Sequence, residues 1–277
     1  MDISVIIPCF NHGHFIQEAI DSVELLSGVE YEIIIIDDGS TDSYTIQKIA
    51  ELKQLNYNII SHPNRGLAYS RNIGIKNAKG KYILPLDADN KIDPAYVYKS
   101  LGILKDGKAD IVYAKPIFFG DLNKARLFEA RAFCGADLFL GNYIDACAIF
   151  DKRVWSSTGG YDENMPVPGH EDWELWLHAH IKEFKFQFLE EFLYFYRIVN
   201  GSMIESTINL YHKNFEYIIK KHASSYIGWF DHYKLINDQL KALEYVFQIN
   251  KTDRDRPLRA IIKYSRLFLK DVFYKNR

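Results

Sequence analysis

Residues 33–42 carry the sequence Ile-Ile-Ile-Ile-Asp-Asp-Gly-Ser-Thr-Asp, in which four β-branched residues are followed at once by acidic and turn-forming ones. A continuous apolar run of this kind is typical of a strand that is buried on both faces, as in a parallel sheet. Ile3–Ile7 is a second such run, and between the two runs apolar residues recur at helical spacing, namely Ile16, Ala19, Ile20 and Val23. The pattern therefore predicts a strand–helix–strand unit.

The same alternation continues to about residue 115. It predicts strands at Ile59–Ile60, Tyr82–Leu86 and Ile111–Tyr113, and helices at Ser43–Leu55, Leu67–Asn77 and Pro94–Lys105. Residues 116–205 are mixed, with expected strands at Ile144–Phe150, Phe186–Leu189 and Phe192–Ile198 and a helix at Glu171–Phe184. Helical patterns then cover about 208–223, 229–249 and 257–275.

We therefore expect an α/β fold with a Rossmann-like, mostly parallel central sheet flanked by helices. Its two halves would be 1–115 and 116–205, and residues 206–277 would form a C-terminal helical extension. The chain has 277 residues, of which 48% are hydrophobic and 25% charged, and this composition excludes a disordered chain and a small disulfide scaffold.

Charge and cysteine content restrict the partners and the compartment. The net charge of −2 offers no electrostatic case for binding nucleic acid. Residues 254–277 hold eight Lys or Arg against two Asp, which leaves the rest of the chain at −8. The three cysteines form no C-x-x-C pair, and no run of 18 apolar residues or basic leader occurs. We expect a cytoplasmic protein with reduced thiols and no membrane-spanning helix.

Polar loops follow three of the predicted strands, at 8–11, 37–40 and 87–90. The carboxyl ends of parallel strands meet at one edge, where open α/β sheets bind ligands. Asp87 and Asp89 can converge there on Mg²⁺ or Mn²⁺, although a solvated acidic turn is the alternative. Asp37 and Asp38 follow a buried strand and need hydrogen-bond donors, which a nucleotide base and ribose would supply. The neighbouring Ser40, Thr41 or Asp42 can equally cap the next helix.

Glu171 and Asp172 open a predicted helix that also contains Trp173 and Trp176. Acidic residues in a first turn are favoured by the helix dipole alone. Alternatively, one of the two carboxylates faces the cleft and removes a proton from a substrate.

Five segments together resemble the family-2 glycosyltransferases, because they occur in the order typical of that family: Val5–Asn11, Ile36–Asp42, Asn64–Gly74, Asp87–Asp89 and Glu171–Trp176. The resemblance covers about residues 3–203. It implies the A-type glycosyltransferase fold and inverting transfer from a nucleotide-diphosphate sugar, most commonly a UDP-sugar, with Mn²⁺ or Mg²⁺ as cofactor. The acceptor would be a hydroxyl of a glycan or a lipid-linked molecule.

The resemblance also implies roles for individual residues. Asp172 would be the catalytic base, and Glu171 would support the base or the acceptor. Asp89 would bind the metal ion together with Asp87, which would also bind the ribose. The nucleotide would contact Pro8, Phe10, Asn11, Asp37, Asp38, Arg65, Arg71 and Asp87. Arg197 and Ser202 resemble a late segment that closes over the diphosphate, although many relatives have His where this chain has Val199.

Other functions remain open on the sequence alone. A sugar-nucleotide pyrophosphorylase shares the general fold, but its first loop is rich in Gly and Arg, whereas this chain has Pro-Cys-Phe-Asn-His-Gly-His at 8–14. A non-catalytic protein that binds nucleotide sugars or glycans is a second class, and an interaction module built on the C-terminal helices is a third. The basic amphipathic pattern at 257–275 predicts either peripheral contact with the inner face of a membrane or packing against the preceding helices or a second subunit.

Overall fold

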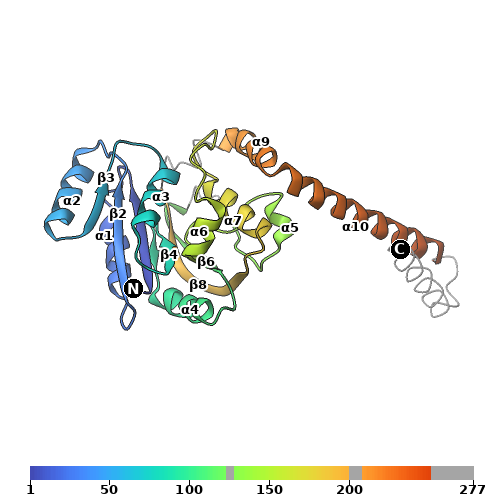
Figure 1. Ribbon diagram of the computed structural model, residues 1–277, viewed down its shortest axis with the longest axis horizontal. Coiled ribbons are helices and arrows are strands. Elements are labelled where there is room, and N and C mark those ends of the chain that lie inside the picture. Colours follow the sequence, from blue (N-terminus) through green and yellow to red (C-terminus); the bar gives the residue numbers. More distant parts are fainter. Residues whose placement is uncertain (123–127, 200–207, 251–277) are drawn as a thin grey trace. The chain divides into compact units, whose positions relative to one another are not determined.

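The computed structural model describes residues 1–122, 128–199 and 208–250. Its strands are β1 (Ile3–Cys9), β2 (Tyr31–Asp37), β3 (Asn58–Ser61), β4 (Tyr82–Pro85), β5 (Lys91–Ile92), β6 (Ile111–Gly120), β7 (Ile149–Asp151) and β8 (Phe186–Ile198). They form one sheet in the order β3-β2-β1-β4-β7-β6-β8-β5, with helices around it (Figure 1). The first four of these strands run parallel, as do β6 and β8, whereas β7 and β5 are antiparallel to their neighbours.

The apolar runs of the sequence become the centre of this sheet. Every residue of β1 is buried, and so are Ile33–Ile36 of β2. Helix α1 (Ile16–Glu24) places its predicted apolar face in the same core, since Ile16, Ala19, Ile20 and Val23 are all fully buried. This part of the α/β prediction is confirmed, because strands covered on both faces have no solvent side on which to carry polar residues.

Local capping explains where several helices begin. Asp42 accepts a hydrogen bond from the backbone N–H of Thr45 at the start of α2 (Ser43–Gln54). Asp93 does the same for Ala95 in α4 (Pro94–Lys105), whose first residue is a proline. Both helices, and α3 (Leu67–Asn77), begin where the sequence predicts. A carboxylate acceptor at the cap and a proline at the first position are the expected signals for such starts.

The chain after residue 110 differs from the prediction in several places, beginning with β6, which runs to Gly120 and not only to Tyr113. The two predicted strands at 186–198 are one strand, β8, which departs from regular pairing opposite Ala114–Pro116. Strand β7 covers only 149–151, because Asp145 accepts a hydrogen bond from the backbone N–H of Cys147 and holds a turn where strand was expected. Helix α7 (Glu171–Ile181) ends before Phe184. Three short elements were not predicted: β5, α5 (Gly135–Leu138) and α6 (Lys152–Thr158).

The C-terminal part is helical, as expected. A 3₁₀ turn (Ile208–Leu210) leads into α9 (Tyr211–Lys221), and α10 (Ala223–Asn250) follows. The chain divides into two compact units, of which the first ends at Ala223. Helix α9 belongs to the first unit, because its buried Asn214 donates hydrogen bonds to the carbonyls of Val167 and Gly169. The predicted helix at 257–275 and Ser202 lie outside the described residues.

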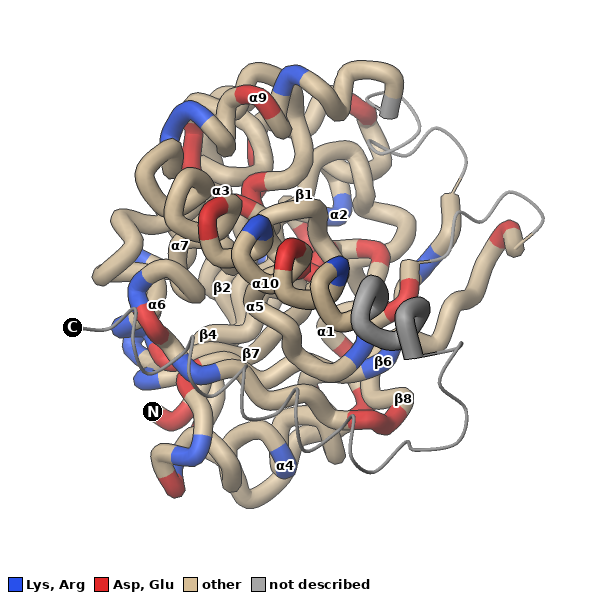
Figure 2. The backbone as a smooth tube through the Cα atoms, turned by 90° about the vertical axis from the view of Figure 1, so that its right-hand side faces the viewer, with Lys and Arg blue, Asp and Glu red and all other residues tan. Residues whose placement is uncertain are grey.

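Two further findings concern the surface. Basic and acidic residues are interspersed along the described chain, for example on α9 (Figure 2). Within the described ranges, no helix is long and apolar enough to cross a membrane.

Candidate active site

Asn11 connects the loop after β1 to the loop after β2 through hydrogen bonds. Its backbone adopts a left-handed conformation with φ of 57°. Its side-chain oxygen accepts hydrogen bonds from the backbone N–H groups of Thr41 (2.7 Å) and Asp42 (3.2 Å). Pro8 is buried within β1, whereas the ring of Phe10 beside it is exposed. Of the predicted nucleotide contacts in this loop, Asn11 therefore acts within the protein, and Phe10 offers an open aromatic face.

Asp38 is almost fully buried, and its two carboxylate oxygens hold the start of α3. They accept hydrogen bonds from the backbone N–H groups of Arg65 (2.7 Å) and Gly66 (3.0 Å). The donors that its burial requires thus come from the protein itself, and His62 Nδ1 lies a further 3.3 Å from Oδ1. Asp37 accepts from the backbone N–H of Ser40 (3.0 Å).

The guanidinium of Arg65 is stacked 3.7 Å from the centre of the Tyr69 ring, on the surface next to this loop. A planar cation that rests on an aromatic face is held in one orientation while its edge stays free to bind an anion. Arg65 therefore lies beside Asp38, to whose carboxylate its backbone N–H donates.

A buried arginine joins the two acidic motifs. Arg71 of α3 is 2% exposed, and it donates hydrogen bonds of 2.7 Å to both Asp87 Oδ1 and Glu171 Oε1. Asp87 follows β4, and Glu171 begins α7, so that one guanidinium connects three elements that are far apart in the sequence. The charges of both carboxylates raise the pKa of Arg71 even though burial opposes this. Arg71 therefore stays protonated, and its guanidinium holds Asp87 and Glu171 at a fixed distance from each other.

Asp172 lies beside this bridge, in the first turn of α7. Its Oδ2 accepts a hydrogen bond from the Asn142 side chain (2.8 Å), and its Oδ1 accepts one from the backbone N–H of Trp173 (2.8 Å). Burial raises the pKa values of both Asp172 and Glu171, while Arg71 opposes the shift. A carboxylate with a raised pKa is a better proton acceptor than a solvated one.

Asp89 is the second acidic residue of the turn after β4. Burial and then the charge of Asp87 raise the pKa of Asp89 to about 6. His12 Nδ1 lies 3.8 Å from Asp89 Oδ2. Arg197 of β8 donates from Nε to the backbone carbonyl of Asp89 (2.9 Å), and its Nη2 lies 2.8 Å from Glu18 Oε1. Arg197 is therefore brought to the predicted metal-binding turn.

Asp145 is a site residue that the sequence analysis missed, since it lay within a predicted strand. Burial, followed by the charge of Asp87, raises its pKa to about 7, and Asp172 contributes in the same direction. The structure thus gathers five carboxylates, those of Asp87, Asp89, Asp145, Glu171 and Asp172. Such an excess of oxygen ligands and negative charge suits a hard divalent cation.

The raised pKa of Asp145 gives a stability prediction. Between about pH 4 and pH 7 the folded protein holds this proton while the unfolded chain has lost it, so stability falls as pH rises, and the penalty is complete above pH 7. We expect Asp145→Asn, measured in EDTA, to raise the melting temperature at pH 8 and to have little effect near pH 4. Asp106→Asn, at an exposed acid at the end of α4, is the control. An unchanged pH profile in Asp145→Asn would contradict the assignment.

Comparison with known proteins places this site in a family. The model of glycosyl transferase family 2 matches residues 4–150, which is more than half of the chain. The chain belongs to this family. The matched region runs from β1 into β7 and includes Asp38, Arg71, Asp87, Asp89 and Asp145. Helix α7, with Glu171 and Asp172, follows it.

Among curated relatives, an uncharacterized glycosyltransferase of Rickettsia felis is 44% identical over 182 residues, which is 63% of this chain and 29% of that protein. The hyaluronan synthase of Pasteurella multocida is 27% identical over 256 residues, or 90% of this chain and 26% of that protein. The chain thus spans less than a third of the length of these relatives.

Solved structures match the fold. Staphylococcus aureus TarS 1–349 in complex with UDP-GlcNAc gives a TM-score of 0.61 at 18% identity, with 74% of this chain and 61% of that chain covered. The mannosyltransferase PcManGT of Pyrobaculum calidifontis, in complex with GDP-Man and Mn²⁺, gives 0.57 at 15% identity, with 74% and 59% covered. The A-type glycosyltransferase fold expected from the sequence is confirmed.

Proposed function

We propose that this chain is an inverting glycosyltransferase that moves a sugar from a nucleotide-diphosphate sugar, with a UDP-sugar as the proposed donor, to a hydroxyl of a glycan or lipid-linked acceptor. The observation that carries the proposal is the bridge of Arg71 between Asp87 and Glu171. The bridge holds Asp87, on the proposed donor side, at a fixed distance from Glu171, the neighbour of Asp172. A single-displacement reaction requires donor and base to be held in such a fixed geometry. Family membership and the nucleotide sugars bound by TarS and PcManGT support the same function.

Asp172 is the proposed base. It accepts the proton of the acceptor hydroxyl, whose oxygen attacks the anomeric carbon while the bond from that carbon to the diphosphate oxygen breaks. A single attack from the opposite face inverts the configuration. Asn142 holds one oxygen of Asp172, and the Trp173 N–H holds the other, so the carboxylate is oriented before substrate arrives. A positioned general base contributes about 10²–10⁴-fold to rate.

The donor would lie along the sheet edge. Pro8 and Phe10 would line the base pocket, with Phe10 stacking on the ring, and Asp37, Asp38 and Arg65 lie in the adjacent loops. Asp87 and Asp89 would hold Mn²⁺ or Mg²⁺, which when bound supplies positive charge for the leaving diphosphate. Arg197 adds a cation next to Asp89, and Ser202 would complete this segment. Asp145, within range of the charges on Asp87 and Asp172, is proposed to contact the transferred sugar.

Donor binding gives the direct test. A panel of nucleotide sugars should include one that, at about 100 times its dissociation constant with Mn²⁺, stabilises the protein by about 2.7 kcal/mol, or roughly 5–10 °C in melting temperature. We expect much less stabilisation in EDTA and in Asp89→Asn, and no change in the surface control Asp106→Asn. Equal stabilisation with and without metal would refute the metal assignment. Binding without hydrolysis or transfer of any donor would support the non-catalytic alternative.

A further inference from the structure

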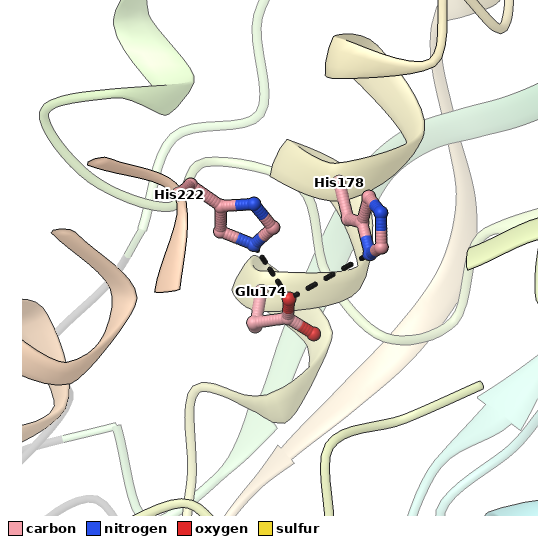
Figure 3. A group of neighbouring side chains, drawn as sticks. All are labelled: Glu174, His178 and His222. Carbon is pink, nitrogen blue, oxygen red and sulfur yellow. Dashed lines mark hydrogen bonds and ion pairs between the residues drawn. The ribbon is translucent and has the colours of Figure 1, made fainter. Parts of the chain in front are cut away.

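A second group of ionisable side chains lies on another face of α7 from the proposed base. Glu174 follows Asp172 by two positions, and residues two apart on a helix do not face each other. Glu174 instead meets His178, one turn further along α7, and His222, which follows the last residue of α9 (Figure 3). Glu174 Oε1 lies 2.7 Å from His222 Nε2 and 3.9 Å from His178 Nδ1. The three donor atoms all lie within 4.8 Å of one another.

This group is buried and incompletely paired. Glu174 is fully buried, His222 is 8% exposed, and the His178 side chain is 21% exposed. Among the described residues, Glu174 Oε2 and His178 Nδ1 have no hydrogen-bond partner. A buried carboxylate oxygen and a buried imidazole nitrogen without partners are costly, because each has given up its contact with water. A ligand that binds both the carboxylate of Glu174 and the imidazole of His178 would remove this cost.

The charges around the group point to a cation. Lys221 Nζ lies 2.6 Å from Asp162 Oδ2 and 2.9 Å from Glu174 Oε1, so one lysine serves two carboxylates. Glu174, Asp162 and Lys221 together carry a net charge of −1, and the two neutral imidazoles add nitrogen electron-pair donors.

We propose that Glu174, His178 and His222 form a zinc site that is separate from the Mg²⁺ or Mn²⁺ position at Asp87 and Asp89. Two imidazoles and one carboxylate are a common zinc donor set, usually completed by water, whereas Mg²⁺ prefers oxygen ligands alone. Tetrahedral ligands at about 2.0–2.1 Å from zinc lie about 3.4 Å apart. The distances of 2.7 and 3.9 Å from Glu174 Oε1 lie on either side of this spacing.

Lys221 provides a test in which zinc affinity is expected to rise, whereas loss of a histidine ligand should lower it. Zinc binding requires its ammonium group to leave Glu174, which it can do while keeping the shorter contact with Asp162. Removing the lysine charge should then strengthen zinc binding, because two cations no longer compete for one carboxylate. A bound zinc ion would join α7, which begins with Glu171 and Asp172, to the end of α9.

Calorimetric titration of the tag-free chain with ZnCl₂, in excess MgCl₂ to occupy the acidic site, tests the proposal. We expect one zinc equivalent per chain, with binding at least about tenfold weaker in His178→Gln and in His222→Gln. His212→Gln, at an exposed histidine on α9, should bind like the unmodified chain. Lys221→Gln should bind more tightly.

Three results would overturn the zinc site: no binding by the unmodified chain, equal binding by His178→Gln, or weaker binding by Lys221→Gln. Melting temperatures measured in EDTA show that each variant is folded before it is titrated. His178→Gln is the most informative variant, because its partly exposed side chain contributes least to the core. An anomalous difference map from zinc-soaked crystals should place the ion between the three side chains, and a peak only at Asp87 and Asp89 would also refute the assignment.

Discussion

Replacement of Asp172 by Asn is expected to reduce sugar transfer at least 100-fold while donor binding survives. The substitution keeps the size of the side chain and an oxygen for the Trp173 N–H, but it removes the ability to accept a proton. It also loses one hydrogen bond, because the new amide and that of Asn142 would both present N–H groups, and this costs about 1 kcal/mol of stability. Turnover with acceptor and thermal stabilisation by donor separate the two effects.

The matched control is Glu171→Gln, which neutralises the neighbouring acid and leaves Asp172 in place. We expect Glu171→Gln to retain more activity than Asp172→Asn, since its carboxylate is occupied by Arg71. Residual activity above about a tenth in Asp172→Asn would contradict a base worth 100-fold or more. In the unmodified protein, activity should fall as pH drops through the raised pKa of Asp172, because the protonated form cannot accept the acceptor's proton.

The first half of the fold could be predicted closely from the sequence because its signals are local. Continuous isoleucine runs, a helical apolar stripe and capping acids at 42 and 93 each act within a few residues, and β1, β2, α2, α3 and α4 begin within two residues of where they were expected. In the second half, the apolar residues around 144–150 and 186–198 predict strands but do not indicate their ends. Those ends depend on the Asp145 turn and on pairing between β6 and β8, which join residues far apart in the chain.

The site shows the same division. The acidic motifs are visible as residue pairs, but their partners are not. Arg71 contacts Glu171 across 100 positions, and Asn142 reaches Asp172 from a loop with no motif of its own. Likewise, only the fold shows that the Asp38 carboxylate accepts hydrogen bonds from the backbone N–H groups of Arg65 and Gly66, just before α3. The sequence offered one usable signal for Asp145, an acid within an apolar segment, which has to be satisfied or functional if the segment is buried.

Arg71→Met is the second substitution with a large expected effect, and it tests the bridge that holds the site together. Methionine retains much of the apolar volume but leaves Asp87 and Glu171 without their shared cation. Removing one partner of a buried ion pair costs about 3–5 kcal/mol, which corresponds to a fall of roughly 6–20 °C in melting temperature for a domain of this size. Transfer activity should be lost as well, because the two motifs are no longer held in register.

Two further measurements show whether the loss is electrostatic. Without Arg71, which lowers the pKa of the buried Glu171, that pKa rises further in the folded state. Glu171 then retains a proton that the unfolded chain releases, so stability falls as pH rises. The destabilisation by Arg71→Met should therefore be smaller at pH 5 than at pH 8. Adding Glu171→Gln to Arg71→Met removes one of the stranded charges and should recover part of the stability at pH 8, but none of the activity. A pH-independent loss, with no recovery in the double variant, would mean that Arg71 acts by packing alone and that the two acidic motifs are positioned by the surrounding core.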